Sequence, residues 1–277
     1  MGGKITIALA GLGSRGKDTY AQAVKKFPEK MEIVAIADID PDKVKEVAEE
    51  FHIPQERCFV SAEDLIAQDK LADVMFITTQ DQQHVRQAIP ALRKGYHLLL
   101  EKPISPDLDE CRELVKVAKE CDRQVIVCHV LRYTPIYSKV KEVIDSGVAG
   151  DIVSVMSIEN VGYWHQEHSF VRGNWRNSNT TSPMILQKCC HDMDLLLWLT
   201  GKTCESVSSF GDTYLFKEDC APEGAAHRCM DGCKVKDSCP YDAEKIYLKH
   251  PEIGVENGHT EWPVNVLTLH PTVESVT

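Results

Sequence analysis

The chain has 277 residues, of which 43% are hydrophobic and 26% charged, a balance typical of a globular protein with room for two domains. Its formal net charge of −11 argues against a nucleic-acid partner, because phosphate binding needs a basic surface. No apolar run approaches the roughly 20 residues of a membrane span, and the N-terminus lacks the pattern of a signal peptide. We therefore expect a cytoplasmic protein that binds neither membranes nor nucleic acid.

Strands and helices alternate through the first half of the chain. Short apolar runs predict strands, and the amphipathic segments between them predict helices. The predicted strands are residues 5–10, 32–38, 72–78, 97–100 and 124–128, and the predicted helices are residues 16–27, 41–51, 83–94 and 107–121. This alternation indicates right-handed crossovers and a parallel sheet, so we expect a doubly wound domain over residues 1–128.

The second half, residues 129–277, has a different pattern. Residues 135–146 and 184–199 have the composition and spacing of helices, whereas residues 151–159, 206–216 and 264–269 are the candidates for strands. A loop rich in His, Trp, Arg and Asn covers residues 163–181, and a cysteine-bearing insertion covers residues 217–242. We expect a second α/β domain here.

A glycine-rich turn follows the first predicted strand. Its sequence is Gly11-Leu12-Gly13-Ser14-Arg15-Gly16, and Asp38 ends the next strand about 20 residues later. The glycines allow a tight turn and a close approach of backbone to a pyrophosphate at the start of a helix. Asp38 can accept both ribose hydroxyls, which favours NAD. Arg15 keeps NADP as the less favoured alternative, because an arginine can accommodate a 2′-phosphate.

Further motifs follow the later strands and suggest a particular family. In chain order they are Thr79-Gln80-Asp81-Gln82-Gln83-His84, Glu101-Lys102-Pro103, Val130-Leu131-Arg132-Tyr133-Thr134-Pro135, Gly150-Asp151-Ile152 and His191-Asp192-Met193-Asp194. Together with the glycine turn, this order resembles the Gfo/Idh/MocA oxidoreductases, the family of glucose–fructose oxidoreductase and inositol dehydrogenase. The resemblance covers about residues 4–215.

The resemblance implies an α/β fold of two parts. An N-terminal Rossmann domain with a doubly wound parallel sheet would precede a C-terminal α/β domain whose open, mainly antiparallel sheet backs the active site and often mediates oligomerisation. Members of the family usually continue for several more strands, so we expect the second domain to be truncated here. The implied partners are a small polar substrate and further copies of the chain in a homo-oligomer.

The resemblance also implies roles for individual side chains. Lys102 matches the family lysine that reaches both the nicotinamide ribose and the substrate hydroxyl, and Glu101, Thr79 and His84 would line the cofactor. A lysine at the carboxyl end of a parallel strand faces the crevice where such sheets bind ligands, which agrees with a catalytic role. His191 matches the family's catalytic histidine and would exchange the proton.

One position of the resembled helix departs from the family. The family usually has an aspartate four residues before the histidine, but this chain has Gln187, which cannot ionise. The partner of His191 therefore stays open, with Lys188 and Asp194 as nearby polar alternatives.

Several side chains are candidates for contacting the substrate. They combine hydrogen-bond donors with flat aromatic faces, which suit a sugar, a cyclitol or a hydroxy acid. The set is Arg132, Tyr133, Trp164, His165, Arg172, Trp175 and His191.

Four cysteines fall within about 20 residues of the insertion and can in principle enclose zinc or an iron–sulfur cluster. They are Cys220, Cys229, Cys233 and Cys239. The spacing contains no Cys-x-x-Cys pair, so ordinary reduced loop cysteines are the alternative.

Three functions fit these features. The leading one is an NAD-dependent oxidoreductase that transfers a hydride between nicotinamide and a hydroxyl of a sugar, cyclitol or similar polyol. The second is a glycosidase or lyase that uses NAD as a transient hydride shuttle. The third is a non-catalytic regulator that senses a dinucleotide, an alternative that the substitution at Gln187 sustains.

Overall fold

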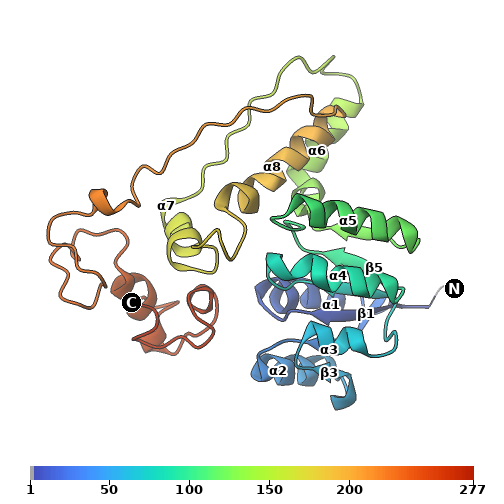
Figure 1. Cartoon of the computed structure of the whole chain (residues 1–277), viewed down its shortest axis with the longest axis horizontal. Helices are drawn as coiled ribbons and strands as arrows, with labels where there is room; N and C mark the ends of the chain where they lie inside the picture. Colours follow the sequence, from blue (N-terminus) through green and yellow to red (C-terminus); the bar gives the residue numbers. More distant parts are fainter. Residues whose placement is uncertain (1–2) are drawn as a thin grey trace. The chain divides into compact units, whose positions relative to one another are not determined.

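We analysed a computed structural model of the chain, which describes residues 3–277 (Figure 1). It divides into two compact units. Unit 1 comprises residues 1–140 and 185–191, and unit 2 comprises residues 141–184 and 192–277. The domain boundary predicted after residue 128 lies 12 residues before the end of the first segment of unit 1, at residue 140. Residues 185–191, in a later helix, also belong to unit 1.

A six-stranded parallel sheet forms the centre of unit 1, with strand order β3-β2-β1-β4-β5-β6. The strands are β1 Ile5–Ala10, β2 Met31–Ala37, β3 Cys58–Phe59, β4 Val74–Ile77, β5 His97–Leu100 and β6 Val125–Val127. Every neighbouring pair is parallel. The predicted Rossmann topology is confirmed, and the chain reverses its direction of winding between β1 and β4.

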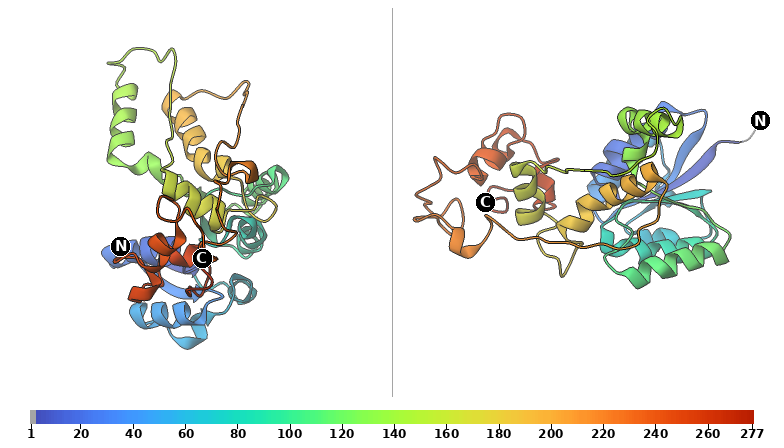
Figure 2. Two further views of the ribbon diagram at one scale, coloured as in Figure 1. Left: turned by 90° about the vertical axis from the view of Figure 1, so that its left-hand side faces the viewer. Right: turned by 90° about the horizontal axis from the view of Figure 1, so that it is seen from above.

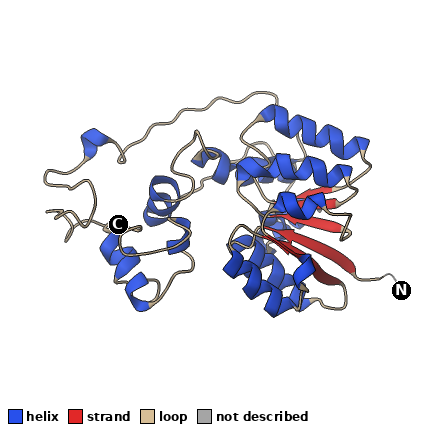
Figure 3. Ribbon diagram, turned by 60° about the horizontal axis from the view of Figure 1, so that its bottom comes forward, coloured by secondary structure: helices blue, strands red, loops and turns tan. Residues whose placement is uncertain are grey.

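Helices cover both faces of this sheet (Figure 3). The α-helices of the chain are α1 Gln22–Lys26, α2 Pro41–Phe51, α3 Ala62–Ala67, α4 His84–Arg93, α5 Leu108–Glu120, α6 Pro135–Asp145, α7 Tyr163–Gln166 and α8 Met184–Thr200. A π-helical segment, η1 (Ser14–Ala21), precedes α1. Two more π-helical segments are η5 Glu167–Arg172 and η7 Glu244–Leu248, and short 3₁₀ helices are η2 Gln55–Arg57, η3 Asp81–Gln83, η4 Val130–Tyr133, η6 Glu218–Cys220, η8 Val255–Asn257 and η9 Val264–Val266.

Local sequence explains where the longer helices begin. Asp40 precedes α2 and its carboxylate accepts backbone N–H bonds at 3.0 Å and 3.4 Å, and Pro41 occupies the first turn. Asp107 caps α5 in the same way, with bonds of 2.7 Å and 3.2 Å. Each cap satisfies donors that would otherwise lack a partner in the first turn.

The core of unit 1 consists of two apolar layers, one on each face of the sheet. Ala8 and Ala10 of β1 face the layer formed with α3, α4 and α5, whereas Ile7 and Leu9 face the layer that contains α1 and α2. Successive strand residues point to opposite faces, and because helices cover both faces most strand residues are apolar.

The strands predicted for the second half are wrong. Residues 151–159 and 206–216 run as extended chain without strand pairing, and Figures 1 and 2 show both as thin loops. Residues 264–266 form the short helix η9 instead of a strand. Among the described residues no strand follows β6, so the predicted open antiparallel sheet is not confirmed. A β-strand requires a hydrogen-bonded neighbour, and the apolar alternation that predicts it does not supply one.

Unit 2 has only a small apolar core. It consists of Ala243, Tyr247, Leu248, Val264 and Val276. Large apolar side chains of the two extended stretches stay in solvent, with Val153 96% and Phe210 97% exposed. Within residues 3–277 no helix combines the length and the apolar character that crossing a bilayer requires.

Candidate functional site

The glycine turn joins β1 to η1, and its glycines have different environments. Gly11 has a φ of +92°, and a Cβ there would lie 2.7 Å from the carbonyl carbon of Thr78. A Cβ on Gly16 would lie 1.9 Å from the carbonyl oxygen of Gly11. Around Gly13, in contrast, no atom lies within 4 Å of such a Cβ. The first and third glycines are therefore required by packing, whereas the space beside the second is open, and a pyrophosphate in that space stays a prediction.

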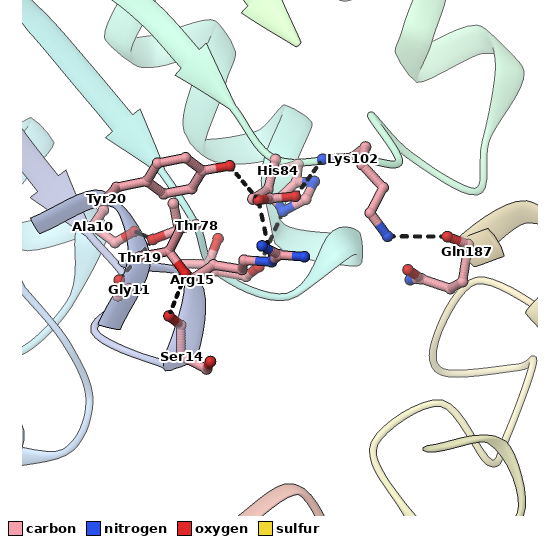
Figure 4. Close-up of polar contacts among 12 residues, drawn as sticks. Ala10, Gly11, Ser14, Arg15, Thr19, Tyr20, Thr78, His84, Lys102 and Gln187 are labelled. Atoms are coloured by element: carbon pink, nitrogen blue, oxygen red, sulfur yellow. Dashed lines mark hydrogen bonds and ion pairs between the residues drawn. The ribbon is translucent and has the colours of Figure 1, made fainter. Parts of the chain in front are cut away.

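Thr78, at the end of β4, holds the turn in place. Its hydroxyl lies 2.9 Å from the carbonyl oxygen of Ala10 and 2.6 Å from that of Gly11, and it donates to one of them (Figure 4). The turn consequently sits at the carboxyl ends of the adjacent strands β1 and β4, where the strand order reverses. In doubly wound sheets the ligand crevice opens at this reversal of strand order.

Asp38 follows β2 and is tied to the same turn. One carboxylate oxygen accepts the backbone N–H of Leu12 at 2.5 Å, and the other accepts the backbone N–H of Asp40 at 2.9 Å. The fold therefore places this carboxylate beside the glycine turn, and its contact with ribose hydroxyls stays a prediction.

Glu101 follows β5 and is 6% exposed. The hydroxyl of Tyr20 donates to its Oε1 at 2.6 Å, and the backbone N–H of Lys102 donates to its Oε2 at 3.0 Å. Arg15 places its Nε 3.8 Å from Oε1. Arg15 is thus directed to the end of β5 and not to Asp38, and Tyr20 is a site residue that sequence reasoning missed.

Lys102 lies next along the chain and is anchored on α8. Its ammonium donates to the backbone carbonyl of Gln187 at 3.0 Å (Figure 4), and this half-buried lysine belongs to unit 1 together with that part of α8. Lys102 and Gln187 are 85 positions apart in the sequence, so only the tertiary fold brings them into contact.

The side chain of Gln187 has a buried acidic partner. Its side-chain amide donates to a carboxylate oxygen of Asp81 at 2.7 Å, and the two residues are 4% and 3% exposed. An aspartate at position 187 would place two buried carboxylates in contact, which like-charge repulsion disfavours. Asp81, in the turn after β4, is thus a buried acidic group that contacts α8 at this position. Its position in the motif after β4 was the available signal.

Thr79 and His84 hold the turn after β4. Thr79 donates its hydroxyl to Gln87 at 2.7 Å. The ring nitrogens of His84 lie 2.8 Å from the carbonyl oxygen of Pro103 and 3.0 Å from that of Thr79, and the residue is 1% exposed. His84 thereby links the turns after β4 and β5. A direct contact of Thr79 or His84 with the cofactor stays a prediction.

His191 on α8 packs against a second histidine. Its ring centroid lies 5.8 Å from that of His129, with the ring planes at 83°. His129 lies two residues after the end of β6, and no motif spacing in the sequence had marked it. The two imidazoles of this pair belong to unit 1, as Lys102 does. Arg132 and Tyr133 belong to η4, a few residues further, where Tyr133 is 76% exposed, and their contact with substrate stays a prediction.

The other predicted substrate residues lie in unit 2, where the structure shows packing contacts. Arg172 forms an ion pair with the buried Glu167 and donates to the carbonyl oxygen of Tyr241 at 2.7 Å. The ring of Trp164 lies 5.3 Å from that of His168 and 6.0 Å from that of His165. These contacts connect residues 163–172 to residues 241–247. Trp175 packs 6.1 Å from Phe170, ring centre to ring centre. Substrate binding by these side chains stays a prediction.

His168 makes the stability of unit 2 depend on pH. The residue is 1% exposed, and burial, with the nearby charges of His165 and Arg172, lowers its pKa to about 4. Between this value and the ordinary pKa of about 6.5 the unfolded chain binds more protons than the folded chain. We therefore expect the free energy of unfolding to fall by up to about 3 kcal/mol as the pH is lowered from 7 to 4.

The measurement is urea unfolding of the parent and the His168→Phe variant at pH 7, 5 and 4. Phenylalanine keeps a flat ring but cannot titrate, so subtracting the variant removes the contributions of the other groups. The stability advantage of the parent should shrink towards acid pH. An advantage that stays constant over this range would show that His168 does not titrate as expected.

The structure corrects the prediction of a metal site. Within residues 3–277 no group of three or more His, Cys, Asp or Glu side chains is placed to hold a metal ion. The thiol of Cys220 is exposed and bonds the carbonyl oxygen of Tyr214 at 3.6 Å. The sulfur of Cys229 accepts a bond from the guanidinium of Arg172 at 3.6 Å, and a cation there opposes a metal. Cys233 and Cys239 are likewise free thiols, and zinc or an iron–sulfur cluster is not supported.

Comparison with known proteins agrees with this geometry. Residues 5–129 match the model of the oxidoreductase family with an NAD-binding Rossmann fold, and residues 137–236 match the GFO/IDH/MocA C-terminal domain. The putative oxidoreductase YteT of Bacillus subtilis is 25% identical over 92% of this chain and 60% of its own length. Inositol 2-dehydrogenase of Corynebacterium glutamicum is 28% identical over 75% of this chain and 57% of its own length.

Solved structures show the same fold. The WlbA dehydrogenase of Chromobacterium violaceum, solved with NADH and UDP-GlcNAcA, aligns with a TM-score of 0.60 at 25% identity, over 72% of this chain and 56% of the other. Scyllo-inositol dehydrogenase of Lactobacillus casei, with NAD(H) and scyllo-inositol, aligns with a TM-score of 0.60 at 24% identity. The chain spans three fifths or less of the length of these relatives. With both family models matched and the glycine turn, Asp38 and Lys102 in place, the chain belongs to the GFO/IDH/MocA oxidoreductases and carries their NAD-binding Rossmann fold.

Proposed function

We propose that the protein is an NAD-dependent oxidoreductase that moves a hydride between nicotinamide and a CH–OH group of a sugar, cyclitol or similar polyol. The observation that carries the proposal is the position of Lys102. Its ammonium lies after β5, two strands from the glycine turn, and is anchored by Gln187 on α8. The names of the relatives, inositol 2-dehydrogenase among them, support a polyol substrate.

The residues of the glycine turn fit a dinucleotide. The open space at Gly13 would receive the pyrophosphate, and Asp38 would accept the ribose hydroxyls of the adenosine half. The bound nicotinamide would supply the hydride acceptor or donor. Since Asp38 repels a 2′-phosphate and Arg15 is directed to Glu101, NAD is favoured over NADP.

Lys102 would act on the substrate hydroxyl through its positive charge. An ammonium beside a hydroxyl orients it and eases its deprotonation, because it stabilises the negative charge that develops on oxygen. His191 would take up the proton, and the neighbouring ring of His129 restricts where the His191 imidazole can point. Gln187 connects Lys102 to Asp81: its backbone carbonyl accepts from the Lys102 ammonium, and its side-chain amide donates to the Asp81 carboxylate.

Turnover on a panel of polyols tests the proposal. Myo-inositol, scyllo-inositol, glucose, xylose and UDP-sugars are each offered with NAD and with NADP, and reduced cofactor is followed by absorbance. We expect NADH formation on at least one cyclitol or sugar and a preference for NAD over NADP. Glycoside cleavage that needs NAD but accumulates no NADH would indicate the hydride-shuttle reaction. Tight NAD binding without any turnover would indicate a regulator.

The assembly and location of the protein are further proposals. Apolar side chains that stay in solvent on the two extended stretches, such as Val153 and Phe210, support self-association. All eleven cysteines are free thiols, which fits the reducing cytoplasm. The mass of the protein in solution, measured by light scattering, tests the homo-oligomer.

A further inference from the structure

A buried carboxylate lies at the end of β5, beside the proposed catalytic lysine. Glu101 is 6% exposed, and its carboxylate contacts the Tyr20 hydroxyl at 2.6 Å, the Lys102 backbone N–H at 3.0 Å and the Arg15 Nε at 3.8 Å. These contacts come from η1 and from the turn after β5, so two separate elements of unit 1 position the carboxylate. The Glu101 carboxylate has no part in the proton or hydride transfer proposed above.

The groups around Glu101 add no further negative charge. Burial, and hydrogen bonds to Cys128 and Glu101, raise the pKa of the Tyr20 phenol far above physiological pH. Burial, followed by the charge of Glu101, raises the pKa of the Cys128 thiol to about 12. Tyr20 and Cys128 are therefore neutral and add no negative charge beside the Glu101 carboxylate. The ring of Tyr20 is fixed by an edge contact with Phe76, at 6.1 Å between centroids.

The location of Glu101 determines which half of the cofactor experiences its charge. In a doubly wound sheet the two halves of a dinucleotide lie on opposite sides of the strand-order reversal. Asp38 after β2 marks the adenosine side, so the nicotinamide side lies at the ends of β4, β5 and β6, and Glu101 follows β5. The nicotinamide ring is cationic in NAD⁺ and neutral in NADH. A buried charge acts on it more strongly than a charge in water would, because the local dielectric constant is low.

We propose that the Glu101 carboxylate, held by Tyr20 and opposed by Arg15, sets the relative affinity of the protein for the two redox forms of the cofactor and favours NAD⁺ over NADH. The inference rests on the proposed function, since it requires the nicotinamide at this end of the sheet. It also predicts opposite effects for two neighbouring residues. Loss of the Glu101 charge weakens the binding of NAD⁺ relative to that of NADH, and loss of the Arg15 charge strengthens the binding of NAD⁺ relative to that of NADH.

The experiment measures the dissociation constants of NAD⁺ and NADH by titration calorimetry on the full chain, without substrate. For Glu101→Gln we expect the ratio Kd(NAD⁺)/Kd(NADH) to rise about tenfold. For Tyr20→Phe we expect a smaller rise, because the carboxylate stays but is no longer held. For Arg15→Gln, whose side chain is 52% exposed and so partly screened, the ratio should fall about twofold.

The ratio separates this role from a structural one. Damage to the fold, or a lost pyrophosphate contact, weakens the binding of NAD⁺ and of NADH by the same factor, so the ratio of their dissociation constants does not change. Tyr96→Phe is the matched control: Tyr96 is fully buried in the same unit and its hydroxyl accepts the backbone N–H of Leu71 at 2.8 Å, away from the glycine turn, so the ratio should not move.

Two results would overturn parts of the argument separately. If the parent and Glu101→Gln bind both forms with the same ratio, the inference is wrong and the proposed function stands. If the parent binds neither form, the proposed function fails and the inference with it. Should Glu101→Gln not fold, Arg15→Gln decides, and an unchanged ratio in that variant contradicts the inference.

Discussion

Replacing Lys102 by methionine should lower kcat by about a thousandfold while the affinity for NAD⁺ changes little. Methionine keeps most of the length and apolar volume of the side chain but removes the ammonium, which now donates to the carbonyl oxygen of Gln187. The positive charge would stabilise the substrate oxygen only as the hydroxyl proton leaves. Removing the ammonium therefore raises the free energy of the transition state and not that of the bound substrate. General acid–base and electrostatic groups of this kind typically contribute about 10²–10⁴ in rate.

Lys94→Met is the matched control for that variant. Lys94 is also a lysine of unit 1 whose ammonium donates to backbone carbonyls, with the oxygen of Ala67 at 3.1 Å, but it follows α4 at the opposite end of that helix from His84. Its replacement should leave kcat within about twofold of the parent. A Lys102→Met enzyme that keeps more than about a tenth of the parental kcat would exclude Lys102 from the chemical step.

Adding a methyl group at Gly16 should damage the fold, whereas the same change at Gly13 should damage only cofactor binding. At Gly16 the new Cβ would lie 1.9 Å from the Gly11 carbonyl oxygen and 2.8 Å from the Thr78 hydroxyl, so backbone must move. We expect a loss of about 3 kcal/mol in the free energy of unfolding, at the upper end of the cost of overpacking. NAD binding should be lost as well, because the turn itself shifts.

At Gly13 the added methyl group meets no atom within 4 Å. We expect the thermal midpoint to stay within about 2 °C of the parent, and the affinity for NAD⁺ to fall at least about tenfold because the methyl group occupies the space for the pyrophosphate. Thermal unfolding with and without NAD⁺ measures both effects. Equal destabilisation by the two variants, or undiminished NAD⁺ binding by Gly13→Ala, contradicts the assigned roles.

Sequence patterns predicted unit 1 well, for a physical reason. Its central strands are buried on both faces, so they appear as largely apolar runs, and the longer helices between them show an amphipathic period. The two-residue strand β3 and the short helix α3 were missed, because segments of that length carry no period. In unit 2 the alternation in residues 151–159 and 206–216 predicted strands that have no hydrogen-bonded neighbour in the structure.

The site was only partly predictable. The glycine turn, Asp38 and the Glu101-Lys102 pair are local motifs at strand ends, and strand ends of a parallel sheet meet at one edge, so their convergence could be expected. Tyr20 and His129 have no such signal, since a tyrosine in a helix and a histidine after a strand are ordinary residues until a partner is known. Their partners, Glu101 and His191, lie 81 and 62 (191 − 129) positions away.

The sequence by itself determined the Rossmann topology, the dinucleotide turn and the family, because those depend on periodicity and on short motifs that each strand presents locally. Only the tertiary structure decided what Gln187 does, where Arg15 points and that the four insertion cysteines do not gather around a metal. These outcomes depend on contacts between residues far apart in the chain: Gln187 with Asp81, Arg15 with Glu101, and Cys229 with Arg172. Hydrogen bonds and ion pairs act over a few ångströms, and no pattern along the chain encodes which distant groups the fold brings that close.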